Sequence, residues 1–253
     1  MFKLPTQPQL TSEILGDSIK LFFFCFPKVL PLILVDVVLS ILLHLHLPQL
    51  VSFDATVIIA SMMNSLIYIC LYMLIALLLH TAIFYRIGAI INQFDMGNLD
   101  ALLQAIKKFK PIFLATAFYT FLVTIGFMVV VPGIIFMVSL RFFTPLILFE
   151  DATVIDSLQR SHKLVWENWF RTAVVLAIPF FFSMSVAGML SGVVEELFRT
   201  TLVKEEILFL MQITSLSVDR LLLPFFYTVI LLLYYDLKRR TKQYSQDEKH
   251  FIA

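Results

Sequence analysis

The chain has 253 residues, of which 60% are hydrophobic, and its mean hydropathy is +0.91. A soluble domain usually contains about 45–50% apolar residues, whereas several apolar runs here reach the roughly 20 residues that cross a ~30 Å hydrocarbon core. The composition excludes an ordinary soluble domain and predicts an all-α, polytopic membrane protein, while the formal net charge of +1 indicates no particular charged partner.

Six transmembrane spans are predicted from the apolar runs, at about 29–47, 57–85, 111–131, 133–150, 170–194 and 207–237. The second and sixth spans are longer than a bilayer requires, so we expect them to tilt, kink or protrude. The third and fourth spans are separated only by Pro132-Gly133. This pair predicts a tight helical hairpin turn, because proline cannot continue the donor ladder and glycine tolerates the turn backbone.

Lysine and arginine are concentrated in alternate connections, which sets the expected orientation. The opposite loops carry only Arg199 and Lys204. The basic residues lie in the N-terminal segment (Lys3, Lys20, Lys28), the second-to-third connection (Arg86, Lys107, Lys108, Lys110), the fourth-to-fifth connection (Arg160, Lys163, Arg171) and the tail (Lys238, Arg239, Arg240, Lys242, Lys249). With six spans, this bias predicts that both termini are cytoplasmic.

Three stretches share one order of features: an aspartate in an amphipathic turn, then apolar and basic positions, then a span. The aspartates are Asp17, Asp100 and Asp156. We interpret these stretches as interfacial helices on the cytoplasmic leaflet, at about 11–26, 97–110 and 153–168. The expected architecture is a single domain, 1–253, built from three units of one elbow helix followed by a transmembrane hairpin.

The basic residues of the second and third elbows are candidate contacts for lipid head groups. They are Lys107, Lys108, Lys110, Arg160 and Lys163. Attraction to anionic head groups contributes about 1 kcal/mol per surface lysine or arginine, which accounts for these clusters without a nucleic-acid motif. We therefore expect membrane lipids, in particular anionic phospholipids, as partners and no nucleic acid.

Motifs of soluble enzymes are missing from the sequence: it contains no Walker loop, GxSxG, HExxH or paired cysteines. His44 and His46 occupy alternate positions, which do not share a face of a helix, so a metal site there would need the helix to unwind. The sequence predicts no enzyme, no cofactor and no metal.

Two charged residues inside predicted spans form the candidate intramembrane site, because a charge in the bilayer is costly. Asp36 lies eight residues inside Lys28, and Arg141 lies nine residues inside Glu150. At ~1.5 Å per residue both are some 12–14 Å from the cytoplasmic boundary. Equal depth predicts that they pair, and His80 is expected to join them.

Two interpretations of this site stay open. Asp36 and Arg141 could form a buried pair that fixes packing. Alternatively, Arg141 could face a cytoplasm-accessible polar cavity and meet an anionic group such as a lipid phosphate. The spacing of Thr116, Thr120 and Thr124 is compatible with both, since such stripes are typical of helix packing but can also line a cavity.

Two stretches resemble a known family. "VPGIIFMVSLRFFTPLILFEDATVIDSLQRSHKLVWENWFRT" (131–172) and "LPFFYTVILLLYYDLKRR" (223–240) resemble the YciC-like bacterial inner-membrane proteins. The first stretch is also similar to the membrane domain of some glycerophosphodiester phosphodiesterases. The shared features are a Pro-Gly turn, an arginine in the next span, and an elbow that corresponds to Asp156, Ser157, Leu158, Arg160 and Ser161.

This resemblance implies a six-span protein of the bacterial inner membrane with a role in envelope or lipid homeostasis, and it implies no catalysis. The expected function is binding, moving or organising glycerophospholipids. One alternative is a non-catalytic scaffold or assembly factor, which would have a protein partner. A secondary transporter of a small anion is another, although the chain has few intramembrane carboxylates for ion coupling.

The predicted orientation can be tested with topology reporters. Fusions after Lys110, Lys163 and Lys242 are expected to report a cytoplasmic location, and fusions near Phe53 and Lys204 an external one, because the lysine and arginine bias sets orientation. One inverted reporter would contradict the arrangement of six spans.

Overall fold

The computed structural model describes residues 4–5, 7–46, 55–94 and 96–251, with side chains described outside 55–64 and 242–251. This part of the chain contains helices and no strand. The helices are α1 (Thr11–His46), α2 (Ala55–Ile91), α3 (Asn98–Lys107), α4 (Phe109–Phe127), α5 (Val131–Ser139), α6 (Phe143–Glu150), α7 (Val154–Trp166), α8 (Trp169–Phe198) and α9 (Lys204–Phe251). The all-α prediction is confirmed.

Six helical segments of the described chain are long and apolar enough to cross a membrane, as predicted. They are Thr11–His46, Ser65–Ile91, Phe109–Phe127, Val131–Glu150, Trp169–Phe198 and Lys204–Thr241. In the fourth and sixth segments, 56% of the apolar stretch that could cross the membrane is buried inside the protein, whereas the share is 17–28% in the other four. The α5–α6 segment and α9 are therefore the inner elements, and the others present most of their apolar surface outward. The protein is a multi-pass membrane protein.

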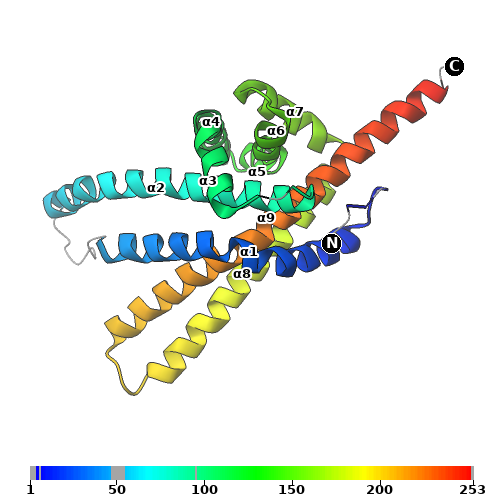
Figure 1. Cartoon of the computed structure of the whole chain (residues 1–253). Coiled ribbons are helices and arrows are strands. Elements are labelled where there is room, and N and C mark those ends of the chain that lie inside the picture. Colours follow the sequence, from blue (N-terminus) through cyan, green and yellow to red (C-terminus); the bar gives the residue numbers. More distant parts are fainter. Residues whose placement is uncertain (1–3, 6, 47–54, 95, 252–253) are drawn as a thin grey trace.

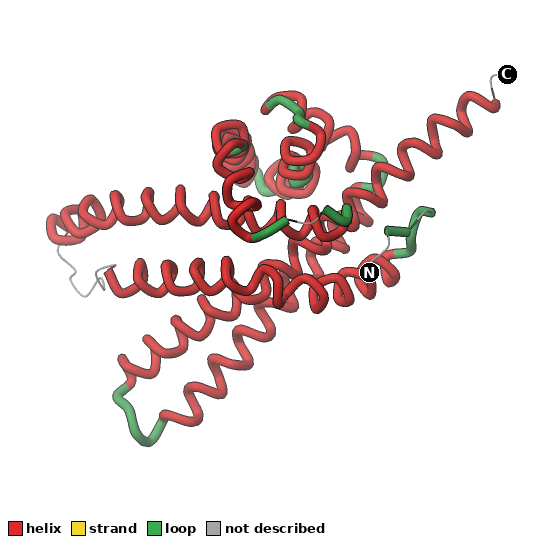
Figure 2. The backbone as a smooth tube through the Cα atoms, viewed as in Figure 1, coloured by secondary structure: helices red, strands yellow, loops and turns green. Residues whose placement is uncertain are grey.

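Two long hairpins form the frame of the molecule. In Figure 1, α1 and α2 run side by side across the view, and α8 and α9 form a second hairpin that diverges from them at the left. Helix α9 packs against α1, α2, α7 and α8. The start of α1 and the end of α9 lie at the same end of this frame, opposite the α8–α9 connection. Figure 2 shows α4 and α6 almost end-on, whereas the helices of the frame run across the view. The hairpin of α4 and α5–α6 thus crosses the frame steeply.

The first predicted elbow is not a separate helix. Helix α1 continues from Thr11 to His46 without a break, although it contains Pro27 and Pro31. Its first half is buried against the bundle through Ile14, Ser18, Leu21 and Cys25, which recur at helical spacing. The predicted interfacial segment 11–26 and the span 29–47 are therefore one element, because the buried stripe continues across the boundary between the two predicted segments.

The second and third elbows do form short separate helices, α3 and α7. The Asp100 carboxylate accepts a hydrogen bond from the backbone N–H of Gly97 (2.9 Å), which caps α3. The hydroxyl of Thr153 accepts one from the backbone N–H of Asp156 (3.4 Å) at the start of α7. The aspartates that suggested the repeat thus mark the first turns of both helices.

The turn between α4 and α5 forms close to the predicted position, but its glycine has a different role from the one predicted. The residue with left-handed backbone is Val130 (φ 64°), and no glycine of the described chain has a positive φ. Gly133 is needed for space instead: a methyl group there would lie 2.6 Å from the backbone nitrogen of Phe127. One on Gly126 would lie 2.8 Å from the Cα of Gly133. The two glycines let the helices approach closely, as small residues do in membranes.

The fourth predicted span is broken in the middle. Helix α5 ends at Ser139 and α6 begins at Phe143, so Arg141 lies in the connection. Pro145 has no N–H to donate to the carbonyl of Arg141, four residues earlier, and its ring disfavours a continuous helix there. The Ser161 hydroxyl of α7 repairs the break, since it donates to the carbonyl of Ser139 (2.7 Å) and accepts from the N–H of Phe142 (3.0 Å).

The repair by Ser161 can be tested by mutation. Ser161→Ala should lower the free energy of unfolding by about 1–3 kcal/mol, because it leaves buried backbone groups at the break without a partner. Ser157→Ala is a matched control, since Ser157 is also buried in α7 but bonds only to the carbonyl of Val154 in its own helix. Chemical denaturation of the detergent-solubilised protein would measure both. Equal losses in the two variants would contradict this role of Ser161.

Candidate intramembrane anion site

Asp36 is a buried charge in the interior of the bundle, with 1% of its surface exposed. Its Oδ2 lies 3.0 Å from Nε2 of His80 on α2 and 3.7 Å from Nε of Arg220 on α9. Its Oδ1 has no hydrogen-bond partner among the described residues. Arg220 also lies over the ring of Tyr72, 5.9 Å from the centroid. Three helices thus meet at one ionic cluster.

The predicted ion pair between Asp36 and Arg141 is wrong, because similar depth does not decide which residues of different helices face each other: Asp36 pairs with His80 and Arg220. Helices α1 and α9 are antiparallel: the N–H of Gln9 donates to Asp236, and the Thr228 hydroxyl donates to the carbonyl of Ser18. Farther along the two helices, Asp36 of α1 lies 3.7 Å from Nε of Arg220 of α9. Asp36 therefore pairs with residues of α2 and α9, and no ion pair joins it to Arg141 among the described residues.

Arg141 lies at another level of the bundle. Its guanidinium carbon is 5.0 Å from the centroid of the Phe226 ring. Phe226 is six residues from Arg220 along α9, which corresponds to roughly 9 Å of helix. Among the described residues, Arg141 has no ion pair and no side-chain hydrogen bond. Cation–π contact with one ring does not replace the hydrogen bonds that a guanidinium with five N–H donors can make.

A cavity of about 270 Å³ lies beside Arg141. Its polar lining comes from α2, α4, the α5–α6 segment and α9, and its walls are completed by apolar side chains. The polar residues are His80, Thr81, Thr116, Tyr119, Thr120, Arg141, Thr144 and Tyr227. No carboxylate lines it. Thr116 and Thr120, two members of the threonine stripe, are therefore lining residues of a cavity and not only helix-packing positions.

The two halves of the predicted site are joined by His80. Its Nε2 faces Asp36, and its ring lines the Arg141 cavity, 6.4 Å from the ring of Tyr227. The site therefore consists of an internally paired cluster, Asp36 with His80 and Arg220, and an adjoining cavity in which Arg141 is the cation. An arginine, a histidine and several hydroxyls can donate hydrogen bonds to an anion with several oxygen atoms.

A second polar network ties the helices together near the chain termini. Glu150 accepts hydrogen bonds from Tyr234, from Arg160 and from Lys238 (2.6 Å). Asp236 has no exposed surface and accepts from Arg171 (2.7 Å), Arg240 (2.8 Å) and the N–H of Gln9 (2.7 Å). Both arginines also donate to the carbonyl of Gln9, at 2.7 Å. Both carboxylate oxygens of Glu150 and of Asp236 already accept hydrogen bonds from the protein, so we interpret this network as structural.

The predicted head-group contacts divide into two classes. Arg160 is paired with Glu150 and Asp156, and Lys108 is paired with Asp151. Lys107, Lys110 and Lys163 are exposed and have no ion pair among the described residues. These three lysines are the ones of the predicted set whose charge is free for an external anion.

The histidines at the end of α1 are parts of ordinary helix. His46 Nδ1 lies 2.7 Å from the carbonyl of Leu42, and the ring of His44 stacks on Phe209, 5.7 Å between centroids. In the part of the chain that the structure describes, no three His, Cys, Asp or Glu residues come together in a way that could hold a metal ion.

Sequence reasoning missed Arg220 and Tyr227. Arg220 follows Asp219 and precedes three leucines, four positions before Pro224, inside the sixth predicted span. A charge so far inside an apolar run is the same signal that identified Arg141. The signal could have found Arg220, but the partner of each charge depends on the register of α1 against α9.

Comparison with known proteins gives one match. A family profile described as "Domain of unknown function (DUF7847)" matches residues 56–237, which is most of the chain and includes α2 to the buried part of α9. No curated protein and no solved structure matches the chain. The matched range contains His80, Arg141 and Arg220, whereas Asp36 lies before it.

A double-mutant cycle tests the assignment of partners. Asp36→Asn and Arg220→Gln are each expected to lower the free energy of unfolding, with a coupling energy of about 0.5–3 kcal/mol, because the two side chains are in contact. Asp36→Asn and Arg141→Gln should add to within about 0.3–0.5 kcal/mol. Denaturation in detergent measures all five variants. Strong coupling to Arg141 and none to Arg220 would reverse our assignment.

Proposed function

The chain belongs to the DUF7847 family, and we propose that it is a non-catalytic membrane protein that binds glycerophospholipids by their anionic head groups in order to hold or move them. The resemblance to YciC-like proteins supports a location in the bacterial inner membrane and a role in envelope homeostasis. The observation that carries the proposal is Arg141, a cation inside a membrane-spanning segment that has no carboxylate partner among the described residues and faces a polar cavity.

The chemistry of the cavity supports a phosphate as the ligand. An arginine in a membrane-spanning segment normally pairs or faces water, because an isolated charge there costs about 2.5–3.5 kcal/mol on insertion scales. Arg141 is half-buried, and its planar guanidinium can bind two oxygens of one phosphate. The hydroxyls of Thr116, Thr120 and Thr144 offer donors and acceptors for the remaining phosphate oxygens and for a glycerol hydroxyl.

The size and position of the cavity favour a lipid head group over a free solute. At ~30 Å³ per water-sized group, 270 Å³ holds about nine such groups, which suits a phosphate with a short alcohol. Thr120 is exposed on α4, the helix with the smallest buried share of the six segments. A ligand could therefore enter from the membrane side and leave its acyl chains outside the bundle.

Native mass spectrometry of the gently extracted protein tests the proposal. Wild-type protein is expected to retain phospholipid at a stoichiometric ratio, and Arg141→Gln to weaken retention about 10- to 100-fold, the equivalent of one charge-assisted hydrogen bond. Arg199→Gln removes the same charge from an exposed residue between α8 and α9 and should retain lipid normally. Equal retention by the Arg141 and Arg199 variants would refute the proposal.

Two further outcomes identify the alternatives. If excess inorganic phosphate displaces the Arg141-dependent ligand, the site binds a small anion, as a transporter would. If another protein co-purifies in place of lipid, and still co-purifies with the Arg141→Gln variant, the chain acts as a scaffold. Unfolding of each variant in detergent serves as the control, since a loss of lipid supports a role of Arg141 in binding only where the variant retains its fold.

A further inference from the structure

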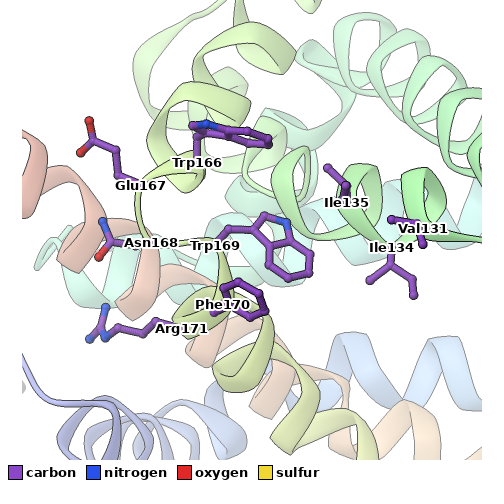
Figure 3. A pocket seen from close by; sticks show the side chains of 9 residues that line it. All are labelled: Val131, Ile134, Ile135, Trp166, Glu167, Asn168, Trp169, Phe170 and Arg171. Carbon is purple, nitrogen blue, oxygen red and sulfur yellow. The ribbon is translucent and has the colours of Figure 1, made fainter.

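We propose a second lipid site: a groove between α5 and the α7–α8 junction that binds one acyl chain of an anionic phospholipid. The groove has a volume of about 740 Å³. Figure 3 shows Val131, Ile134 and Ile135 on one wall and the rings of Trp166 and Trp169 on the other. This site is separate from the cavity beside Arg141, which lies beyond the C-terminal end of α5.

The groove exists because α7 and α8 meet at a bend in the chain. Helix α7 ends at Trp166 and α8 begins at Trp169, with Glu167 and Asn168 between them. In Figure 3 the side chains of Glu167, Asn168 and Arg171 point to the side opposite the wall of α5. Arg171 is fixed there by its ion pair with Asp236 (2.7 Å). The polar groups of the junction are thus turned away, and the aromatic rings face α5.

The occupant must be apolar along most of its length, because the facing walls are aliphatic and aromatic. At ~30 Å³ per water-sized group, the volume of the groove corresponds to about two dozen such groups, which is enough room for one phospholipid acyl chain. The groove is continuous with apolar surface that faces outward: Val131 is 63% and Phe170 is 82% exposed. A membrane lipid reaches it directly, whereas a peptide segment would bring backbone groups for which these walls have no partners.

Two polar groups, one on a residue that lines the groove and one a helical turn away from it, match the other end of a phospholipid. The indole N–H of Trp169, a residue that lines the groove, has no hydrogen-bond partner among the described residues, and a small rotation of the ring would let it donate to an ester carbonyl. Lys163 lies one turn before Trp166 on α7 and is exposed and free of ion pairs within the described chain. A phosphate at Lys163 and a chain beside the tryptophans would follow the usual order of head group, aromatic belt and hydrocarbon.

The test uses the protein's own fluorescence, because Trp166 and Trp169 are its two tryptophans. Full-length protein in detergent micelles is titrated with an anionic phospholipid that carries brominated acyl chains, which quench tryptophan at contact. We expect quenching that saturates at about one lipid per protein. Trp166→Phe and Trp169→Phe each leave one reporter, and both reporters should be quenched in this saturable phase.

A pair of matched substitutions shows whether the groove is responsible. Ile134→Phe adds bulk to the groove, and Ile178→Phe adds the same bulk to α8 outside it; the two isoleucines are 38% and 39% exposed. We expect Ile134→Phe to weaken the saturable phase severalfold, and Ile178→Phe to leave it unchanged. Lys163→Gln should weaken binding of an anionic lipid about fivefold and spare a zwitterionic one, as expected for one surface lysine.

The result that overturns the proposal is quenching that rises in proportion to the brominated fraction without saturation, as for ordinary boundary lipid. Quenching of Trp166 without quenching of Trp169 would also overturn it, since the chain would then not enter the groove. Tryptophan shielding that depends on protein concentration would assign the groove to a second copy of the chain. Because Arg141→Gln should leave this signal intact, failure here is distinguishable from failure of the proposed head-group site.

Discussion

The antiparallel contact between α1 and α9 is the constraint on which the rest of the structure depends. In a bilayer, helices gain little from burying apolar surface against each other, so close packing and interhelical polar bonds decide their arrangement. Polar bonds fix this contact at both ends and in the middle, through Asp236, Thr228 and the Asp36–Arg220 pair. A slip of one turn would separate Asp36 from Arg220 and Asp236 from the N–H of Gln9. Polar contacts thus help to specify the register.

With that register fixed, the broken α5–α6 segment places Arg141. Pro145 interrupts the helix, and the Ser161 hydroxyl supplies both a donor and an acceptor to the interrupted backbone. The connection then directs Arg141 toward the cavity, with Phe226 on one side. All the carboxylates nearest in the sequence are already used: Glu150 binds three other donors. Arg141 faces the cavity without an ion pair among the described residues, and this is why we propose an external anion as its partner.

The sequence predicted the helical class, the six apolar segments and two of the three short helices, because each depends on local composition and spacing. It also identified Asp36, His80 and Arg141 as the intramembrane polar residues. It assigned the wrong partner to Asp36, since that assignment needs the register of two helices about 200 residues apart in the chain. The role of Gly133 was misread for a related reason: its Cβ position is crowded by Phe127 of the preceding helix, a contact that no local turn rule predicts.

The two proposed sites require different parts of one kind of molecule. The cavity at Arg141 offers cationic and hydroxyl groups and little room for hydrocarbon, whereas the groove at Trp169 offers hydrocarbon walls and one unpaired N–H. A small anion would satisfy the first and leave the second empty, and an apolar partner would do the reverse. An anionic phospholipid supplies both chemistries. Since α5 forms a wall of the groove and leads directly into the connection that carries Arg141, a rigid shift of this one helix would alter both sites together.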